Sequence, residues 1–237
     1  MDGFNGGLAM DDTIVNEIYK KFVRVNDTPE YRNRYVPLPL HLNNQKWKWE
    51  KKDFPRVIAL LEFKRYMEKY NFNFDKILSF NGQEDPEYQY ISFKDSVNIN
   101  YTDDIVNNDL HRLNLSETDF DFVMLNQTFE HLYDPISVAK SLYTHLKDGG
   151  IFYCNVPSNN RPHSTPYHYY TGFTPVGLGV IMKLAGFEIL EIGQWGNRQY
   201  LNNLFRSGWT DYRLNNSVNE INCPVITWIL AVKRGIK

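Results

Sequence analysis

Residues 120–157 constrain the fold of this chain more than any other segment, because two apolar runs flank one amphipathic pattern. The first run, FDFVMLN (Phe120–Asn126), is of the kind found in a strand that is buried on both faces of a sheet. The second run is IFYCNVP, residues 151–157. A strand, a helix and a second strand in this order predict an α/β fold.

The helix predicted between the two runs has its own start and stop signals. Asp134 is a favourable N-cap, and Pro135 fits the first helical position. Gly149 and Gly150 fit the end of the helix. The apolar positions recur at steps of three and four residues, so one face can lie on the sheet: Ile136, Ala139, Leu142, Tyr143 and Leu146.

Further runs extend the α/β pattern along the chain. We predict strands at residues 76–81, 96–100, 187–193 and 225–233, and a helix capped by Thr174 and Gly186. Two more helices are expected, near residues 12–23 and from about Pro55 onward. Residues 84–93 contain Pro86 and several residues that favour strands, so a regular helix is not expected there.

The motifs in these segments resemble a known family. FDFVMLNQTFEHLYDP and HLKDGGIFYCNVP look like the second half of a class I S-adenosylmethionine-dependent methyltransferase, in which a strand ends near Glu-His-Leu and a helix runs to Lys-x-Gly-Gly. Residues 168–197 are similar to the Phe-Thr-Pro, Gly-Leu and Ala-Gly-Phe-Glu pattern of its compact, type 11-like branch, some of whose members methylate sugar hydroxyls. The resemblance covers about residues 76–233. It implies a Rossmann-like, seven-stranded, mostly parallel sheet with an antiparallel last strand.

Length and composition are consistent with one main domain. In a chain of 237 residues we expect an N-terminal helical extension or cap, residues 1–73, and a methyltransferase-like domain, residues 74–237. The net charge of −2, with acidic and basic residues mixed along the chain, disfavours a nucleic-acid partner. No apolar stretch approaches the roughly 20 residues that span a bilayer, so membrane insertion is not expected.

Cysteine usage and the N-terminus bear on metal binding and location. The two cysteines have neither metal-like spacing nor a disulfide pattern, and we predict no metal site. No basic segment followed by an apolar one occurs at the N-terminus, which favours a cytoplasmic protein. The sequence leaves the oligomeric state open.

The resemblance implies S-adenosylmethionine as the cofactor and indicates where its contacts should lie. In the family, a glycine-rich turn after the first strand approaches the methionine part. Here that turn contains Asn81 and Gly82, with one glycine where several are usual, and Ser79 stands where an acid is common. Asn81 and Gly82 both tolerate a tight turn, so they are candidate cofactor contacts. An ordinary turn without a ligand is the alternative.

The next two family contacts involve the ribose and the adenine. Asn100, Asp103 and Asp104 follow the second strand and are candidates for the ribose, with solvated loop residues as the alternative. Asp109 and Leu110 resemble the Asp-Leu pair before the family's fourth strand, so Asp109 is the candidate adenine contact. An Asx turn is the alternative for Asp109.

The end of the strand at Phe120–Asn126 is expected to open onto the ligand, because ligands in open α/β sheets bind at the carboxyl edge. Asn126 and Gln127 are candidate contacts to the methionine part or the acceptor. Glu130 is a candidate acceptor contact, and His131 is a candidate base because imidazole titrates near neutrality. A histidine that only packs at the helix entrance is the alternative.

The segment between residues 157 and 174 is rich in rings. His163, Tyr169 and Tyr170 are candidate acceptor contacts, since aromatic faces with polar edges suit sugars, and His168 is a second candidate base. Rings that only cover the edge of the core are the alternative.

We therefore predict an S-adenosylmethionine-dependent O-methyltransferase that acts on a hydroxyl of a carbohydrate or small molecule, in glycan modification. A catalytically inactive methyltransferase fold that serves as a binding or scaffold module is the alternative, because the glycine turn is reduced. A nicotinamide-dependent enzyme ranks last, since the chain lacks the G-x-G-x-x-G turn.

Overall fold

One mixed sheet forms the centre of the protein. The computed structural model describes residues 12–36, 54–80, 85–100, 108–208 and 217–235. Within them, six strands follow the order β2-β1-β3-β4-β6-β5. Their bounds are β1 Lys76–Ser79, β2 Asp95–Asn98, β3 Phe120–Asn126, β4 Leu146–Pro157, β5 Glu188–Trp195 and β6 Ile226–Val232. β2, β1, β3 and β4 pair in parallel, whereas β6 is antiparallel to both β4 and β5.

The predicted Rossmann-like α/β architecture is confirmed, including the antiparallel last strand, but the predicted number of seven strands is wrong for the described residues. The chain offers six strand-like runs, and the seventh was implied by the resemblance alone. In the described residues between β2 and β3, the chain forms only a short 3₁₀ helix, η6 (Leu110–Arg112). The Pro86–Tyr90 segment is likewise a 3₁₀ helix, η5, as the absence of a regular helix pattern there predicted.

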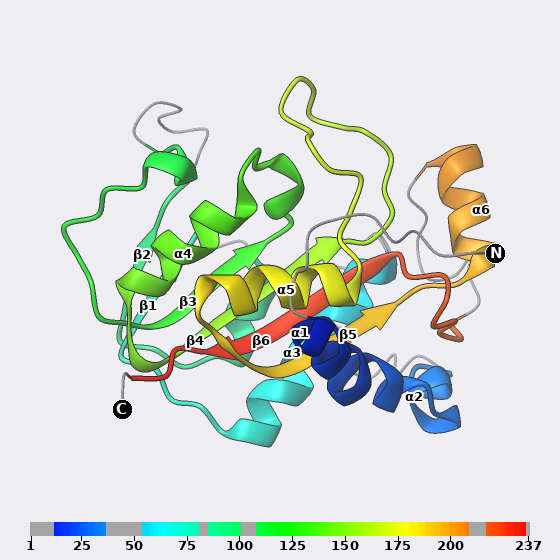
Figure 1. Ribbon diagram of the computed structural model, residues 1–237, viewed down its shortest axis with the longest axis horizontal. Coiled ribbons are helices and arrows are strands. Elements are labelled where there is room, and N and C mark those ends of the chain that lie inside the picture. Colours follow the sequence, from blue (N-terminus) through cyan, green and yellow to red (C-terminus); the bar gives the residue numbers. More distant parts are fainter. Residues whose placement is uncertain (1–11, 37–53, 81–84, 101–107, 209–216, 236–237) are drawn as a thin grey trace.

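Helices cover both faces of the sheet (Figure 1). Their bounds are α1 Asp12–Ile18, continued by a π turn to Val23, α2 Pro29–Asn33, α3 Phe54–Tyr70, α4 Pro135–His145, α5 Pro175–Ala185 and α6 Arg198–Ser207. Alternate residues of β3 separate the two cores: Val123 and Leu125 pack with α1, α4 and α5, and Phe122 and Met124 pack with α3. None of the described helices combines the length and apolarity that crossing a bilayer requires.

The helix α4 begins as predicted but ends earlier. The Asp134 carboxylate accepts a hydrogen bond from the Ser137 backbone N–H (3.1 Å), and Pro135 is the first helical residue. The helix stops at His145, so the prediction that it runs to Gly149 and Gly150 is wrong. Leu146 already pairs with Phe120 of β3, and this long-range pairing begins β4 before the glycines are reached.

The helix α5 has the predicted caps. The Thr174 hydroxyl accepts a hydrogen bond from the Gly177 backbone N–H (3.1 Å). Gly186, with a φ of 100°, ends the helix in the left-handed region that glycine tolerates best. Because α5 begins right after the long loop from β4, its N-cap also fixes where that loop ends.

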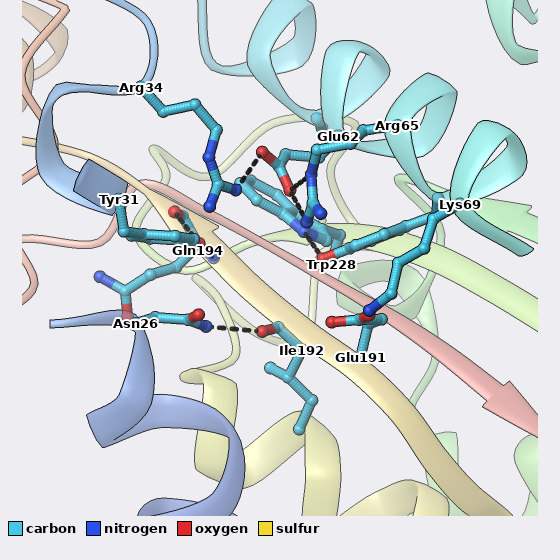
Figure 2. Close-up of polar contacts among 12 residues, drawn as sticks. Asn26, Tyr31, Arg34, Glu62, Arg65, Lys69, Glu191, Ile192, Gln194 and Trp228 are labelled. Carbon is cyan, nitrogen blue, oxygen red and sulfur yellow. Dashed lines mark hydrogen bonds and ion pairs between the residues drawn. The ribbon is translucent and has the colours of Figure 1, made fainter. Parts of the chain in front are cut away.

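The N-terminal segment, residues 12–36, lies along β5, which is an edge strand of the sheet (Figure 2). The Asn26 side-chain amide donates to the Ile192 carbonyl (2.9 Å). The Tyr31 hydroxyl donates to the Gln194 carbonyl (3.0 Å) and accepts from the Gln194 N–H (2.9 Å). Side chains of the segment thus satisfy backbone groups of β5.

The division of the chain into an extension and a domain at residue 73 stays a prediction.

A buried carboxylate joins this N-terminal segment to α3 (Figure 2). The Glu62 side chain is 1% exposed and accepts hydrogen bonds from Arg34 (2.7 Å), Arg65 (2.7 Å) and the Tyr35 hydroxyl (2.5 Å). Burial alone would raise the pKa of Glu62, but the two arginines and these hydrogen bonds outweigh burial and lower it. The carboxylate is therefore charged in the folded protein.

Candidate functional site

A cavity of about 720 Å³ opens where several parallel strands end. Phe80 follows β1, Ile99 follows β2, and Gln127 follows β3, so the cavity lies at the carboxyl edge of the sheet. Ligands of open α/β sheets bind at this edge. The volume falls within the roughly 300–1,000 Å³ that is typical of small-molecule sites.

The structure brings six of the predicted site residues to the wall of this cavity: Asn100, Asp109, Leu110, Gln127, His131 and Tyr169. Five others do not line it: Asn126, Glu130, His163, His168 and Tyr170. Asn81, Gly82, Asp103 and Asp104 lie outside the described residues. The individual roles assigned to these residues stay predictions.

Asn126 and Gln127 differ in their access to the cavity. Asn126 is 1% exposed, and its amide donates to Asp85 (3.1 Å) and accepts from the Asn155 amide (2.6 Å), so it holds β3 to its surroundings beneath the cavity. Gln127 has a φ of 50°, and its side-chain amide donates to the Asn155 side chain (2.8 Å). This left-handed backbone turns the chain out of the sheet just where the cavity begins.

Asp109 forms the turn that was its alternative interpretation, and it also lines the cavity. Its carboxylate caps η6 by accepting from the His111 N–H (3.0 Å), and the His111 ring nitrogen Nδ1 lies 2.9 Å from the same oxygen. Burial alone would raise the pKa of Asp109, but the hydrogen bonds from His111 outweigh it and lower the pKa. The Asx-type turn therefore presents a charged carboxylate at the cavity wall.

His111 and Tyr133 line the cavity without having been predicted. Their rings stack, with centroids 3.6 Å apart and planes 11° from parallel. The second ring nitrogen of His111 accepts from the Asp134 N–H (3.3 Å), which ties the stack to the start of α4. No spacing in the sequence indicates this pair, because η6 and the residues just before α4 meet only through the tertiary fold.

His131 presents one ring nitrogen with a lone pair. Its Nδ1 donates to the Tyr167 carbonyl (2.7 Å), and because a carbonyl can only accept, the proton must be on Nδ1. Burial lowers the pKa of His131 and outweighs the hydrogen bond to Tyr167, which raises it. The ring is therefore neutral at pH 7, with Nε2 able to accept a proton.

Glu130 precedes His131 in the chain and is 0% exposed. Neither carboxylate oxygen has a hydrogen-bond partner among the described residues. Burial raises the pKa of Glu130 to about 7. One oxygen of this carboxyl group lies 3.8 Å from His131 Nε2.

The loop between β4 and α5 is fixed against this corner of the cavity; in Figure 1 it is the tall yellow-green loop. The backbone N–H groups of Tyr169 and Tyr170 donate to the Glu130 carbonyl (2.9 and 3.1 Å). The Tyr170 hydroxyl donates to the Tyr133 carbonyl (3.1 Å). These bonds place His163 and His168 beside His131, with ring centroids 4.5–5.4 Å apart.

Comparisons with known proteins found similar sequences and folds. A family model described as a methyltransferase domain matches residues 78–192. A solved S-adenosylmethionine-dependent methyltransferase from Clostridium acetobutylicum superposes with a TM-score of 0.52 at 12% identity, covering 86% of this chain and 99% of that chain. No curated protein matches the chain at a significant level.

The fold is also similar to that of a second solved structure, phosphoethanolamine N-methyltransferase 2 from Haemonchus contortus, in complex with phosphomonomethylethanolamine and S-adenosylhomocysteine. It superposes with a TM-score of 0.51 at 13% identity, and covers 90% of this chain and 60% of that chain. At such identities both likenesses concern the fold.

Proposed function

We propose that this chain is a class I S-adenosylmethionine-dependent methyltransferase that methylates a hydroxyl of a carbohydrate or small-molecule acceptor, a proposal supported by its fold and by the family match over residues 78–192. The observation that carries this proposal is that Asp109 and His131 line the same cavity. One side chain suits a cofactor and the other suits the removal of a proton. Glycan modification is the process that fits such an acceptor.

The cavity fits the cofactor in size and in chemistry. Phe80, Ile99 and Leu110 supply apolar wall for the adenine, and the charged Asp109 can accept from its amine. We assign Asn100 to the ribose and Gln127 to the methionine part, which is supported by their positions at the cavity wall. When bound, S-adenosylmethionine supplies an electrophilic methyl group on its sulfonium.

The chain's own contribution to transfer is positioning and proton removal. The neutral His131 can accept the acceptor's hydroxyl proton at Nε2, while its Nδ1 stays fixed on Tyr167. His168 has a lowered pKa through burial and through the neighbouring His163 and His131, so it is the second candidate base. Tyr169 offers an aromatic face at the cavity wall for a sugar ring.

Calorimetric titration of the purified protein with S-adenosylhomocysteine tests the cofactor site without knowledge of the acceptor. We expect saturable binding in the low micromolar range. Asp109→Ala is expected to weaken it by about 10–100-fold, because hydrogen bonds to charged groups contribute about 1.5–3 kcal/mol. Asp109→Asn retains an oxygen that can cap η6, and its remaining loss reports the charge itself.

Asp148→Ala is the matched control, since Asp148 is exposed and lies at the opposite end of β4 from the cavity. It should bind as the wild type does. An equal loss in Asp148→Ala would contradict the assigned cofactor site. An absence of binding and of thermal stabilisation at high ligand concentration would instead favour the non-catalytic binding module.

The acceptor is tested by transfer of a labelled methyl group to a panel of sugars, nucleotide sugars and glycans. Transfer to none of them would refute a carbohydrate acceptor. We place the reaction in the cytoplasm, because two cysteines without a disulfide pattern are typical of proteins of reducing compartments.

A further inference from the structure

Three histidines from two separate segments converge beside the cavity. His131 ends the 3₁₀ helix η7 (Phe129–His131), whereas His163 and His168 lie on the loop between β4 and α5. One ring nitrogen from each histidine lies within 4.8 Å of a ring nitrogen of each of the other two. Proton removal by one base needs only one of these rings, so the proposed methyl transfer does not account for the cluster.

The hydrogen bonds of two of these rings fix which nitrogen carries the lone pair. The Nδ1 atom of His131 donates to the Tyr167 carbonyl (2.7 Å), and the Nδ1 atom of His163 donates to the Arg161 carbonyl (3.0 Å). Carbonyl oxygens only accept, so the lone pair is on Nε2 in both rings. Metal-binding histidines are held in the same way, by an acceptor on the nitrogen remote from the ion.

The remaining polar atoms of this corner are buried without partners. Both ring nitrogens of His168 and both carboxylate oxygens of Glu130 lack a hydrogen bond among the described residues. Leaving such groups unsatisfied costs about 1–3 kcal/mol each. The Glu130 side chain is 1% exposed, and one of its oxygens lies 3.8 Å from His131 Nε2. A cation among these atoms would satisfy both groups at once.

We propose that His131, His163 and His168, with the Glu130 carboxylate beside them, bind a divalent transition-metal ion, for which Zn²⁺ is the best match. Imidazole nitrogens suit Zn²⁺, whereas Mg²⁺ and Ca²⁺ prefer oxygen ligands. Ring nitrogens at 2.0–2.1 Å from a tetrahedral ion would lie about 3.4 Å apart. Binding would therefore require side-chain rotations that bring the ring nitrogens closer than the present limit of 4.8 Å.

The ion would lie beside the cavity, since His131 lines the cavity wall whereas His163 and His168 do not. The ion and the acceptor proton compete for the same Nε2 lone pair of His131. The metal site itself rests on the geometry of the three histidines and Glu130, and only this consequence rests on the proposed function.

The test uses the full chain, stripped with a chelator and then titrated with Co²⁺ or Zn²⁺ in the absence of S-adenosylmethionine. We expect one equivalent to bind, with the visible absorption of tetrahedral Co²⁺ and a rise in Tm on Zn²⁺ binding. His163→Ala and His168→Ala should each weaken binding by about 100-fold or more, and the double variant should abolish the Co²⁺ spectrum. Glu130→Gln should weaken binding by about tenfold or more.

His145→Gln is the matched control, because His145 lies on α4 outside the cluster, with its Nδ1 bonded to the Ser141 carbonyl. It should bind Co²⁺ as the wild type does. Equal Co²⁺ binding by the wild type and the double variant, or an absence of Co²⁺ absorption in the wild type, would overturn the proposal. The assay contains no methyl donor, so either result is independent of whether S-adenosylhomocysteine binds.

Discussion

His131→Ala is expected to lower kcat for methyl transfer by about 10²–10⁴-fold, the usual contribution of a positioned general base. The rate should be measured with a labelled methyl donor and the best acceptor from the panel, in the presence of a chelator. Affinity for S-adenosylhomocysteine should change little, because the proton is taken from the acceptor. His145→Gln should retain the wild-type kcat.

The pH dependence gives a second readout for His131. A base works only when it is deprotonated, so kcat should rise with pH through the pKa of His131. Burial lowers this pKa below the ordinary value of 6.5, and the wild type should therefore stay active further into the acid range than an exposed histidine would allow. If His131→Ala retains both the rate and this acid limb, His131 is not the base.

Glu62→Gln is expected to lower the free energy of unfolding by about 2–3 kcal/mol. Removing one partner of a fully buried ion pair costs about 3–5 kcal/mol, because the other charge is left unpaired. Here the arginines that remain, Arg34 and Arg65, are 25% and 38% exposed, so water replaces part of the lost interaction. Urea unfolding followed by circular dichroism measures the difference.

The control for Glu62 is Lys69→Ala, which breaks the neighbouring pair with Glu191. The Lys69 side chain is 51% exposed, and exposed pairs contribute about 0–1 kcal/mol. The folded pKa of Glu62 is lowered, so its contribution should be present above the ordinary pKa of 4.5 and be lost as the pH falls through the folded value. A Glu62→Gln variant as stable as Lys69→Ala would contradict the importance assigned to this network.

Local sequence patterns predicted the elements whose causes are local. The apolar run of β3 is buried at every position, and the caps of α5 are the residues expected from their side chains. The early end of α4 could not be predicted, because it depends on the pairing of Leu146 with Phe120, and no local pattern contains this information.

The site was predictable only in part, for the same reason. Motifs in the sequence led to Asp109 and His131, and both line the cavity. The stack of His111 on Tyr133 and the convergence of the three histidines require contacts between segments that are distant in the chain. Asn81 and Gly82, at the position of the family's glycine-rich turn, lie outside the described residues.

The N-terminal segment also affects how copies of this protein behave toward one another. An edge strand of a sheet has unpaired backbone groups that can pair with a strand from a second molecule, which is a common route to aggregation. β2, at one rim, has only four residues, and short rim strands are poor templates. At the other rim, Asn26 and Tyr31 already occupy backbone groups of β5. The segment thus shields β5 from self-association, and its removal should make the protein prone to aggregate.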